Sequence, residues 1–451
     1  MMYTTAPARE CAPFLLPCAL HRELQHRLDT LARIHRVPGA QLVLDTGAQV
    51  VALHTGTADA AVGVPFGEDT AVPLGSLTKP YTAALVLLLA DDGDLDLDDR
   101  VAGHLPELRD LPEVTIRQLL SHTSGLPTGA DSDAAARTTA PRYLSSVGSG
   151  RDSLFPAGTD FSYSNAGYVA AGRLVETVTG MPWHEAVTAL LLEPLGTAPA
   201  FIGTPAARPV AAGHALNTAT GRVRPVRQNL APLEAPAGAL LASGADLAAL
   251  GRALVGRTGV LPSAVAKEMR RPEPAADPGA LADAWGLGLA LYQQDDQQWC
   301  GHDGNAQGTS CHLRAEPDSG TVVAFTGNSG AATALWRDLA DDLARIAGVR
   351  VPAVIAPAKR GDPATVPECA GSYVNGGIPY RVALEPDGSP TLSVDGDLPI
   401  PLRCYADLSF DLLDPVTGRP EGGGRFHRDP ATGAIDRVQI SGRTARRTGL
   451  V

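Results

Sequence analysis

A serine and a lysine three positions apart are the residues of this 451-residue chain best suited to chemistry. Ser76 and Lys79 lie directly before the apolar run 81–90, which predicts a helix, and residues three apart are neighbours on a helix. A serine hydroxyl becomes a strong nucleophile only when an adjacent base takes its proton. A lysine is such a base only where burial or neighbouring cations lower its pKa. The spacing therefore predicts a Ser76 nucleophile with Lys79 as its base.

The scarcity of lysine supports this interpretation of Lys79. The chain has three lysines (Lys79, Lys267 and Lys359), so 34 of its 37 basic residues are arginine. Arginine keeps its proton in proteins and cannot act as a base. A lysine at this position favours neutral-amine chemistry over the alternative, a surface residue at an ordinary helix start.

Two further stretches follow in a recognisable order. Tyr163-Ser164-Asn165 precedes a helical pattern, and His302-Asp303-Gly304 follows a strand-like run ending at Trp299. Ser-x-x-Lys, then Tyr-Ser-Asn, then His-x-Gly resembles the serine β-lactamase and penicillin-binding-protein superfamily, closest to its class C and D-stereospecific peptidase and esterase branch. Residues 119–127 and 236–240 add to the resemblance, which covers about residues 20–348.

The resemblance implies an α/β fold class. We expect a β-lactamase-like domain over residues 1–348, with an antiparallel sheet flanked by helices and an all-helical lobe. The sequence itself predicts an amphipathic helix at 21–35, a hairpin of strands 40–44 and 50–54, and a closing helix at 331–346. Residues 128–153 are expected to form a long loop bordering the cleft. Residues 203–235 are expected to be irregular and to form its other wall.

The C-terminal part has a different character. Residues 349–369 contain four prolines and are interpreted as a linker. From residue 370 to residue 451, short strand-like runs alternate with Gly- and Asp-rich turns, which predicts a small antiparallel β-barrel. It resembles the lipocalin-like domain appended to some members of the superfamily.

The resemblance also assigns the catalytic roles. Ser76 attacks a carbonyl, and Lys79 with Tyr163 takes and relays its proton. Asn165 is expected to hydrogen-bond Lys79 and the acyl chain. His302 stands where lysine is common in the family, and it is expected to hold Tyr163 or the leaving group.

Four residues are assigned to substrate binding. By resemblance, the backbone N–H groups of Ser76 and Asn305 form the oxyanion hole, and Gly304 and Gly238 line the same site. The last strand-like segment carries Arg443, Arg446 and Arg447. We expect Arg446 to reach the cleft; the alternative is that all three are solvated or pair within their own domain.

Other candidate sites are interpreted as structural. His122 is a candidate base, but the resemblance makes it a brace for the loop beside the active helix. The acidic stretch 91–99 lacks the glycine and the closing glutamate of a calcium loop. The six cysteines have no Cys-x-x-Cys spacing, so we expect reduced thiols, no metal and no cofactor.

Composition limits the partners. A net charge of −12 and a pI near 5.4 argue against nucleic acid or an anionic membrane as partner. The apolar segment 12–20 is broken by Pro13 and Pro17, which favours a mature arm over a signal peptide. The run 81–90 is too short to span a bilayer. We expect a cytoplasmic protein.

These expectations define the function. The expected cytoplasmic location and the C-terminal barrel make the chain most like the stand-alone penicillin-binding-protein-type thioesterases, which release and cyclise nonribosomal peptides. The expected donor is a peptidyl thioester ending in a D-residue, from a peptidyl carrier domain of a nonribosomal peptide synthetase. The alternatives are a hydrolytic esterase, a D-stereospecific peptidase or a class C β-lactamase-like hydrolase. A catalytically idle binding protein is the alternative from another class.

Overall fold

The structure is a computed structural model that describes residues 16–129, 132–353, 362–415 and 417–449. Its helices are α1 (Leu16–Ile34), α2 (Thr78–Asp91), α3 (Val101–His104), α4 (Ile116–Leu120), α5 (Ser132–Ala135), α6 (Ala140–Val147), α7 (Asn165–Thr179), α8 (Trp183–Val187), α9 (Ala235–Gly238), α10 (Gly244–Leu254), α11 (Ser263–Met269) and α12 (Ala332–Ala347). Its first twelve strands are β1 (Gly39–Asp45), β2 (Val50–Asp59), β3 (Val64–Pro65), β4 (Val72–Pro73), β5 (Gly213–Asn217), β6 (Arg222–Val226), β7 (Leu241–Ala242), β8 (Ala284–Trp285), β9 (Ala290–Gln294), β10 (Gln297–Gly304), β11 (Ser310–Glu316) and β12 (Thr321–Gly327).

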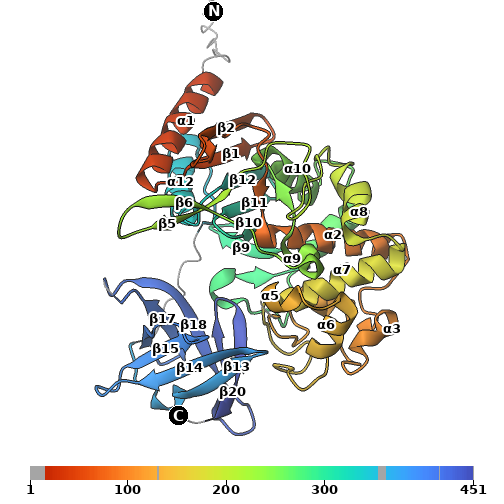
Figure 1. The fold of residues 1–451 in the computed structure, drawn as a ribbon, viewed down its shortest axis with the longest axis vertical. Helices are drawn as coiled ribbons and strands as arrows, with labels where there is room; N and C mark the ends of the chain where they lie inside the picture. Colours follow the sequence, from red (N-terminus) through yellow and green to blue (C-terminus); the bar gives the residue numbers. More distant parts are fainter. Residues whose placement is uncertain (1–15, 130–131, 354–361, 416, 450–451) are drawn as a thin grey trace, which may run out of the picture.

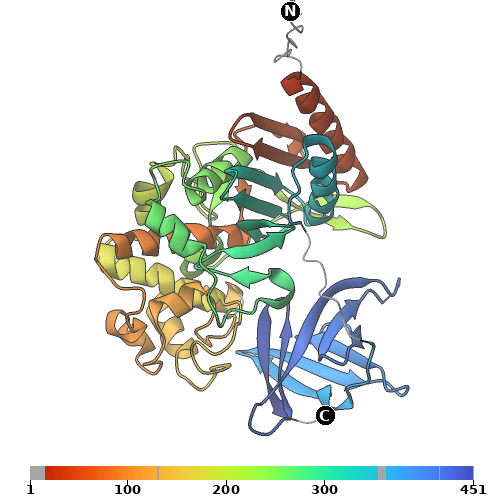
Figure 2. The ribbon, with the colours of Figure 1, turned by 180° about the vertical axis from the view of Figure 1, so that it is seen from behind.

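An eight-stranded sheet forms the centre of the first domain, in the order β3-β2-β1-β12-β11-β10-β9-β8. All neighbours in it are antiparallel. Strand β1 is buried along its whole length, because side chains alternate between two covered faces. Leu42 and Leu44 belong to the core beneath α1 and α12, whereas Val43 belongs to the core of the other face. Figures 1 and 2 show α1 and α12 side by side over the sheet.

The helical lobe is built around α2. Nearly every residue of this helix is buried, so it is apolar on all sides rather than amphipathic. Helices α7, α9 and α11 pack against it. The nucleophile segment therefore enters the most enclosed helix of the lobe, which keeps water from its first turn.

The C-terminal part is a closed antiparallel barrel, as predicted. Its strands are neighbours in chain order: β13 (Gly371–Asn375), β14 (Ile378–Leu384), β15 (Pro390–Val394), β16 (Ile400–Cys404), β17 (Ser409–Leu413), β18 (Pro420–Arg428), β19 (Ile435–Ile440) and β20 (Arg443–Gly449). Pairing of β20 with β13 closes it. Phe410, Phe426 and Tyr373 fill its interior.

The β19–β20 hairpin docks the barrel onto the first domain. Ile440 pairs with Arg443 across a two-residue turn, in which Ser441 and Gly442 both have positive φ, as a type I′ turn requires. The Tyr163 N–H donates to the Gly442 carbonyl at 2.8 Å, and the Thr444 hydroxyl donates to the Phe161 carbonyl at 2.8 Å. The tip of this hairpin therefore lies against the Tyr-Ser-Asn segment.

Three segments differ from expectation or lie beyond description. The expected loop at 128–153 contains α5 and α6; α6 has a proline in its first turn, where proline is tolerated, and it buries Tyr143 and Leu144. The expected irregular wall at 203–235 contains the β5–β6 hairpin and a 3₁₀ turn at Pro232–Glu234, and α9 begins at its last residue. Helix α1 begins at Leu16, with Pro17 in its first turn, where proline is tolerated. Most of the predicted N-terminal arm lies outside the described residues.

Candidate active site

The structure brings Ser76 and Lys79 together. Ser76 lies in a short 3₁₀ turn, Gly75–Leu77, that leads into α2. Lys79, in the first turn of α2, donates to Ser76 Oγ at 3.1 Å and to the Ala237 carbonyl at 2.9 Å. Lys79 is fully buried. A buried amine in hydrogen-bond contact with a hydroxyl has the geometry of a general base.

The electrostatic surroundings favour the neutral amine. Burial lowers the pKa of Lys79 well below its usual range, and the Arg443 guanidinium lowers it further, whereas the Glu234 carboxylate acts in the opposite direction. Glu234 is itself buried in the wall that carries Ala237, where it accepts hydrogen bonds from Ser132 Oγ and the Ala231 N–H.

Tyr163 lies beside both residues. Its ring centre is 4.9 Å from Lys79 Nζ, which in turn donates to Ser76 Oγ. Burial raises the pKa of Tyr163, although the contact with Ser76 and the charge of Arg443 act against this. Tyr163 is therefore a phenol in the free enzyme, which suits a proton relay better than a base.

His302 lies behind Tyr163 at the end of β10. Its Nδ1 bonds the Asp303 carbonyl, which can only accept, so Nδ1 carries the proton and Nε2 is the acceptor. Nε2 lies 3.4 Å from the Tyr163 hydroxyl. Burial and the charge of Lys79 lower the pKa of His302 to about 3, so the ring is neutral.

The expected bond between Asn165 and Lys79 is not made. Asn165 is the first residue of α7, and its N–H donates to the Thr128 carbonyl at 2.9 Å. Its Oδ1 is buried without a partner in the described part of the chain. Lys79 donates to the Ala237 carbonyl instead. Asn165 thus presents an unpaired acceptor, which fits contact with a substrate N–H.

Close backbone packing brings the other segments to Ser76. Gly75 has a φ of +53°, and a Cβ there would lie 2.2 Å from the Asn305 carbonyl oxygen. A Cβ on Gly304 would lie 2.0 Å from the Leu74 carbonyl oxygen, and one on Gly238 would lie 3.9 Å from the Gly75 carbonyl carbon. The absence of side chains at Gly75 and Gly304 lets the Asn305 segment pack against the nucleophile turn, whereas Gly238 lies at ordinary contact distance from it.

The arginine in the site is Arg443, and not Arg446 as expected. Arg443 Cζ lies 5.1 Å from the ring centre of Tyr163, whereas Arg446 Nη2 donates to the Arg151 carbonyl at 2.8 Å. Both arginines contact the first domain, but the Arg151 carbonyl binds Arg446, whereas the hairpin tip that meets the Tyr-Ser-Asn segment carries Arg443. Arg443 directly follows the β19–β20 turn and therefore lies at the docked end. Arg447 lies inside the barrel over the ring of Tyr373.

His122 braces the site. It is buried with a φ of 61°, and its Nδ1 accepts the Ser164 N–H at 3.1 Å. Its ring centre lies 4.3 Å from that of Tyr163. Burial and the charge of Lys79 lower the pKa of His122 well below its usual range, so it remains neutral. These contacts fix the orientation of Tyr163.

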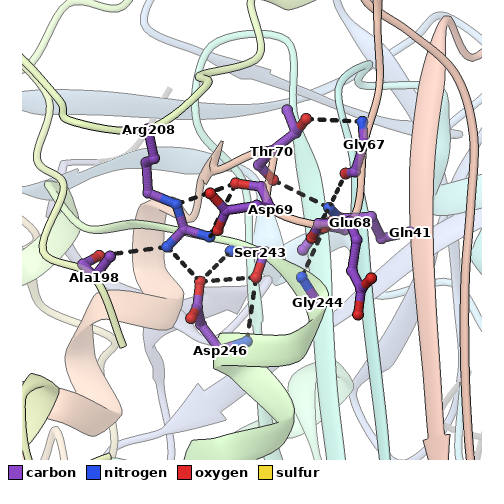
Figure 3. Close-up of polar contacts among 11 residues, drawn as sticks. Gln41, Gly67, Glu68, Asp69, Thr70, Ala198, Arg208, Ser243, Gly244 and Asp246 are labelled. Atoms are coloured by element: carbon purple, nitrogen blue, oxygen red, sulfur yellow. Dashed lines mark hydrogen bonds and ion pairs between the residues drawn. The ribbon is translucent and has the colours of Figure 1, made fainter. Parts of the chain in front are cut away.

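A polar network fixes the segment that precedes Ser76 (Figure 3). The Arg208 guanidinium, 4% exposed, pairs with Asp69 at 2.5 Å and Asp246 at 2.7 Å. Gln41 Nε2 donates to the carbonyls of Gly67, Glu68 and Thr70. The loop that enters β4 is thereby tied to the central sheet and to the start of α10.

Sequence reasoning missed three contributors. Arg443 was among the arginines considered, and the Ser441-Gly442 pair is a turn signal that would have placed it at a hairpin tip. Glu234 gave no sequence signal, and Ala237 lies in the stretch 236–240 that adds to the resemblance, but no role was assigned to its carbonyl. In the described ranges, no cluster of His, Cys, Asp or Glu is arranged to hold a metal ion. None of the helices in those ranges has the length and apolar character needed to cross a membrane.

Known proteins are similar to this chain in sequence and fold. Penicillin-binding protein 4 of Amycolatopsis lactamdurans is 36% identical over 384 residues, which is 80% of this chain and 99% of that protein. The crystal structure of SurE has 35% identity and a TM-score of 0.85, covering 96% of this chain and all of SurE; SurE has also been solved with D-Leu, with a TM-score of 0.84. A D-stereospecific amidohydrolase from Streptomyces sp. has 27% identity and a TM-score of 0.59, over 73% of this chain and 99% of its own.

The family model described as beta-lactamase matches residues 24–347, the range that holds the sheet, the helical lobe and the Ser76–Lys79 pair. With relatives matched over nearly their full length, the chain belongs to the beta-lactamase family, within the superfamily that includes the penicillin-binding proteins.

Proposed function

We propose that this protein releases a peptidyl thioester by acyl transfer through Ser76 and passes the acyl group to the amine of the same peptide, closing a ring. The observation that carries the acyl-transfer step is the 3.1 Å contact between Ser76 Oγ and a fully buried Lys79. Membership of the beta-lactamase family supports acyl transfer through a serine. The thioester donor and the ring closure are the finer part of the proposal.

The geometry supports a two-step reaction. Ser76 Oγ attacks the thioester carbonyl as Lys79 takes its proton, and the N–H groups of Ser76 and Asn305 stabilise the oxyanion. The C–S bond then breaks, and the proton passes from Lys79 through the Tyr163 hydroxyl to the departing thiolate. In the second step, the amine attacks the carbonyl of the Ser76 ester, the bond between that carbonyl carbon and Ser76 Oγ breaks, and the proton of the amine passes through the same relay to Ser76 Oγ.

Neutral His302 supports Tyr163 in both steps. Its Nε2 accepts from the phenol, so the hydroxyl is oriented while its own proton is shared. Because both His302 and His122 stay neutral, neither adds positive charge that would compete with protonation of Lys79 in the intermediate. The relay therefore uses one amine and one phenol.

One comparison supports a D-configured donor, and two side chains fit a peptide substrate. The likeness to SurE extends over the barrel, and SurE has been solved with D-Leu. In this chain the barrel places Arg443 beside Tyr163, where its guanidinium fits a carbonyl or carboxylate of the substrate. Asn165 Oδ1 offers an acceptor for a peptide N–H.

Hydrolysis is the second candidate. The Streptomyces amidohydrolase is matched over 73% of this chain, and its name describes D-stereospecific hydrolysis of amides. Water in place of the peptide amine gives that outcome at the same Ser76 ester. The expected cytoplasmic location and the carrier-domain donor remain parts of the first proposal.

The test is a panel of peptidyl thioesters in pairs that differ only in the configuration of the C-terminal residue. We expect mass spectrometry to show a product lighter than the linear acid by one water, and strong preference for the D epimer. Ser76→Ala is the control for spontaneous cyclisation. A linear acid as the sole product would support the hydrolase, and equal rates for both epimers would contradict D selectivity.

A further inference from the structure

A basic hairpin stands beside the candidate active site. Strands β5 and β6 project from the central sheet as an arm, seen in yellow-green in Figures 1 and 2. We define the basic arm as residues 213–227, which carry Arg222, Arg224 and Arg227. We propose that this arm docks the acidic face of the carrier domain that delivers the thioester. The inference rests on the proposed function and names the surface that its partner uses.

The charge of the arm is exceptional for this chain. The protein has a net charge of −12, yet residues 194–233 contain no aspartate or glutamate. Arg222, Arg224 and Arg227 are exposed, and within the described ranges none of their guanidinium groups forms an ion pair or a hydrogen bond; the backbone N–H of Arg222 donates to Thr220 Oγ1. Unpaired cations on an acidic protein are available to an external anion.

The hairpin register keeps these side chains available. Arg224 pairs with Ala215 and Arg222 pairs with Asn217, so neither faces a carboxylate across the strands. Residues two apart on a strand share a face, which puts both guanidinium groups on one side of the arm. Arg36 adds a further cation at the tip, since a Cβ on Gly221 would lie 1.4 Å from its Nη1.

The base of the arm is fixed to the turn that follows Asn305. The His214 N–H donates to the Gly308 carbonyl at 2.8 Å, and Gln228 Nε2 donates to the Gln307 carbonyl at 2.7 Å. A Cβ on Gly213 would lie 2.0 Å from the same Gln307 oxygen. A partner held on the arm is therefore positioned next to the oxyanion side of the Ser76 site.

His214 also ties the arm to the sheet. Its buried ring accepts the Ala60 N–H at Nε2, 3.1 Å away, and donates from Nδ1 to the Asn328 carbonyl at 2.9 Å. The ring is thus held from two sides. The base of the arm is therefore held rigidly against the sheet, and this limits the conformational entropy lost when a partner binds.

An acidic protein fits these observations better than a nucleic acid. The remaining surface repels a long polyanion, whereas a small domain with one acidic helix touches only the arm. Arginine binds carboxylates with two parallel hydrogen bonds, which gives orientation as well as attraction. A thioester on the flexible arm of a carrier domain needs that orientation to enter the site.

The experiment compares two donors with one peptide. The first is the peptide on the phosphopantetheine arm of an acidic peptidyl carrier domain, and the second is its N-acetylcysteamine thioester. For the variant Arg222→Ser/Arg224→Ser/Arg227→Ser, we expect KM for the carrier-bound donor to rise about tenfold at low salt. We expect kcat/KM for the carrier-free donor to change less than about twofold. The difference in KM for the carrier-bound donor between the wild type and the triple variant should shrink as ionic strength rises.

Matched variants separate docking from general charge. Arg109→Ser/Arg381→Ser/Arg403→Ser removes the same charge from exposed positions away from the arm and should leave both donors unaffected. A variant with lysine in place of the three arm arginines should keep most of the wild-type preference for the carrier-bound donor over the carrier-free donor. Thermal unfolding of each variant checks that the fold is intact.

The outcomes are distinct. An arm variant that keeps wild-type KM with the carrier-bound donor overturns the inference, as does an equal loss with both donors or an equal loss in the matched variant. The inference would also be overturned if a DNA oligonucleotide bound the arm as tightly as the carrier domain does. If the wild type turns over neither thioester, the proposed function fails; arm-dependent binding of the carrier domain in a direct titration would then still support the docking surface.

Discussion

Arg443 and Lys79 approach the same aromatic ring, with Arg443 Cζ 5.1 Å and Lys79 Nζ 4.9 Å from the ring centre of Tyr163. One cation comes from the last strand of the barrel and the other from the first turn of α2. Like charges this close disfavour the protonated lysine. The barrel therefore contributes to the chemistry of the base as well as to the wall of the site.

The first prediction concerns the acidic limb of the pH profile of kcat/KM for a small thioester. This limb reports the neutral form of Lys79 in the free enzyme. Arg443→Ala removes a positive charge, so the pKa of Lys79 rises and the limb should move to higher pH. Glu234→Gln removes a negative charge, so the limb should move to lower pH. Arg446→Ala is the matched control and should leave the limb in place; two shifts of the same sign would refute the assignment.

The second prediction tests the base directly. Lys79→Arg puts a permanently protonated group at this position, which cannot accept a proton, so acylation should slow by about 10³-fold or more. Labelling of Ser76 by a fluorophosphonate, followed by intact mass, measures this rate. Ser76→Ala should give no adduct. An arginine variant that labels at near the wild-type rate would show that Lys79 is not the base.

The third prediction concerns close packing at the nucleophile turn. Gly75→Ala places a Cβ 2.2 Å from the Asn305 carbonyl oxygen and should destabilise the protein by about 1–3 kcal/mol, with loss of Ser76 labelling. Gly63 also has a positive φ, +72°, but has no atom within 4 Å of its Cβ position. Gly63→Ala therefore isolates backbone strain from the collision. Equal unfolding midpoints for the two variants would show that the contact is not tight.

The fourth prediction links the buried base to stability. Because the folded state lowers the pKa of Lys79, the unfolded chain binds more protons at pH values between the folded pKa and the unfolded value of about 10.4. Stability therefore rises with pH across that window. Lys79→Met removes the ionisable group and should raise the thermal midpoint at neutral pH. The gain over wild type should shrink as pH approaches 10; a gain independent of pH would point to packing instead.

The sequence was sufficient for features carried by local pattern. Ser76 and Lys79 are three apart on a helix, and the strands of the barrel alternate with turns, so both could be predicted. The order of the three motifs led to the family. Each of these depends on neighbours in the sequence or on recurrence within the superfamily.

What could not be predicted depends on contacts between distant segments. Asn165 was expected to bond Lys79, but the Ala237 carbonyl takes that hydrogen bond, and a backbone carbonyl leaves no mark in a sequence. Strand alternation favoured Arg446, because alternation identifies a face and not the end of the barrel that docks. Whether Arg443 or Arg446 meets the site is decided by the packing of two domains.

The docked hairpin has a consequence for the order in which the protein matures. Thr444 bonds Phe161 across 283 residues of chain, and Arg443 reaches its place only when β20 closes the barrel against β13. The barrel strands follow the first domain along the chain, and domains fold as units, the N-terminal one first during synthesis. A chain with a folded first domain and an open barrel has Ser76 and Lys79 in contact but lacks the second cation, so its lysine holds its proton more tightly. We expect such an intermediate to be a slow acylator, and catalytic competence to appear with completion of the barrel.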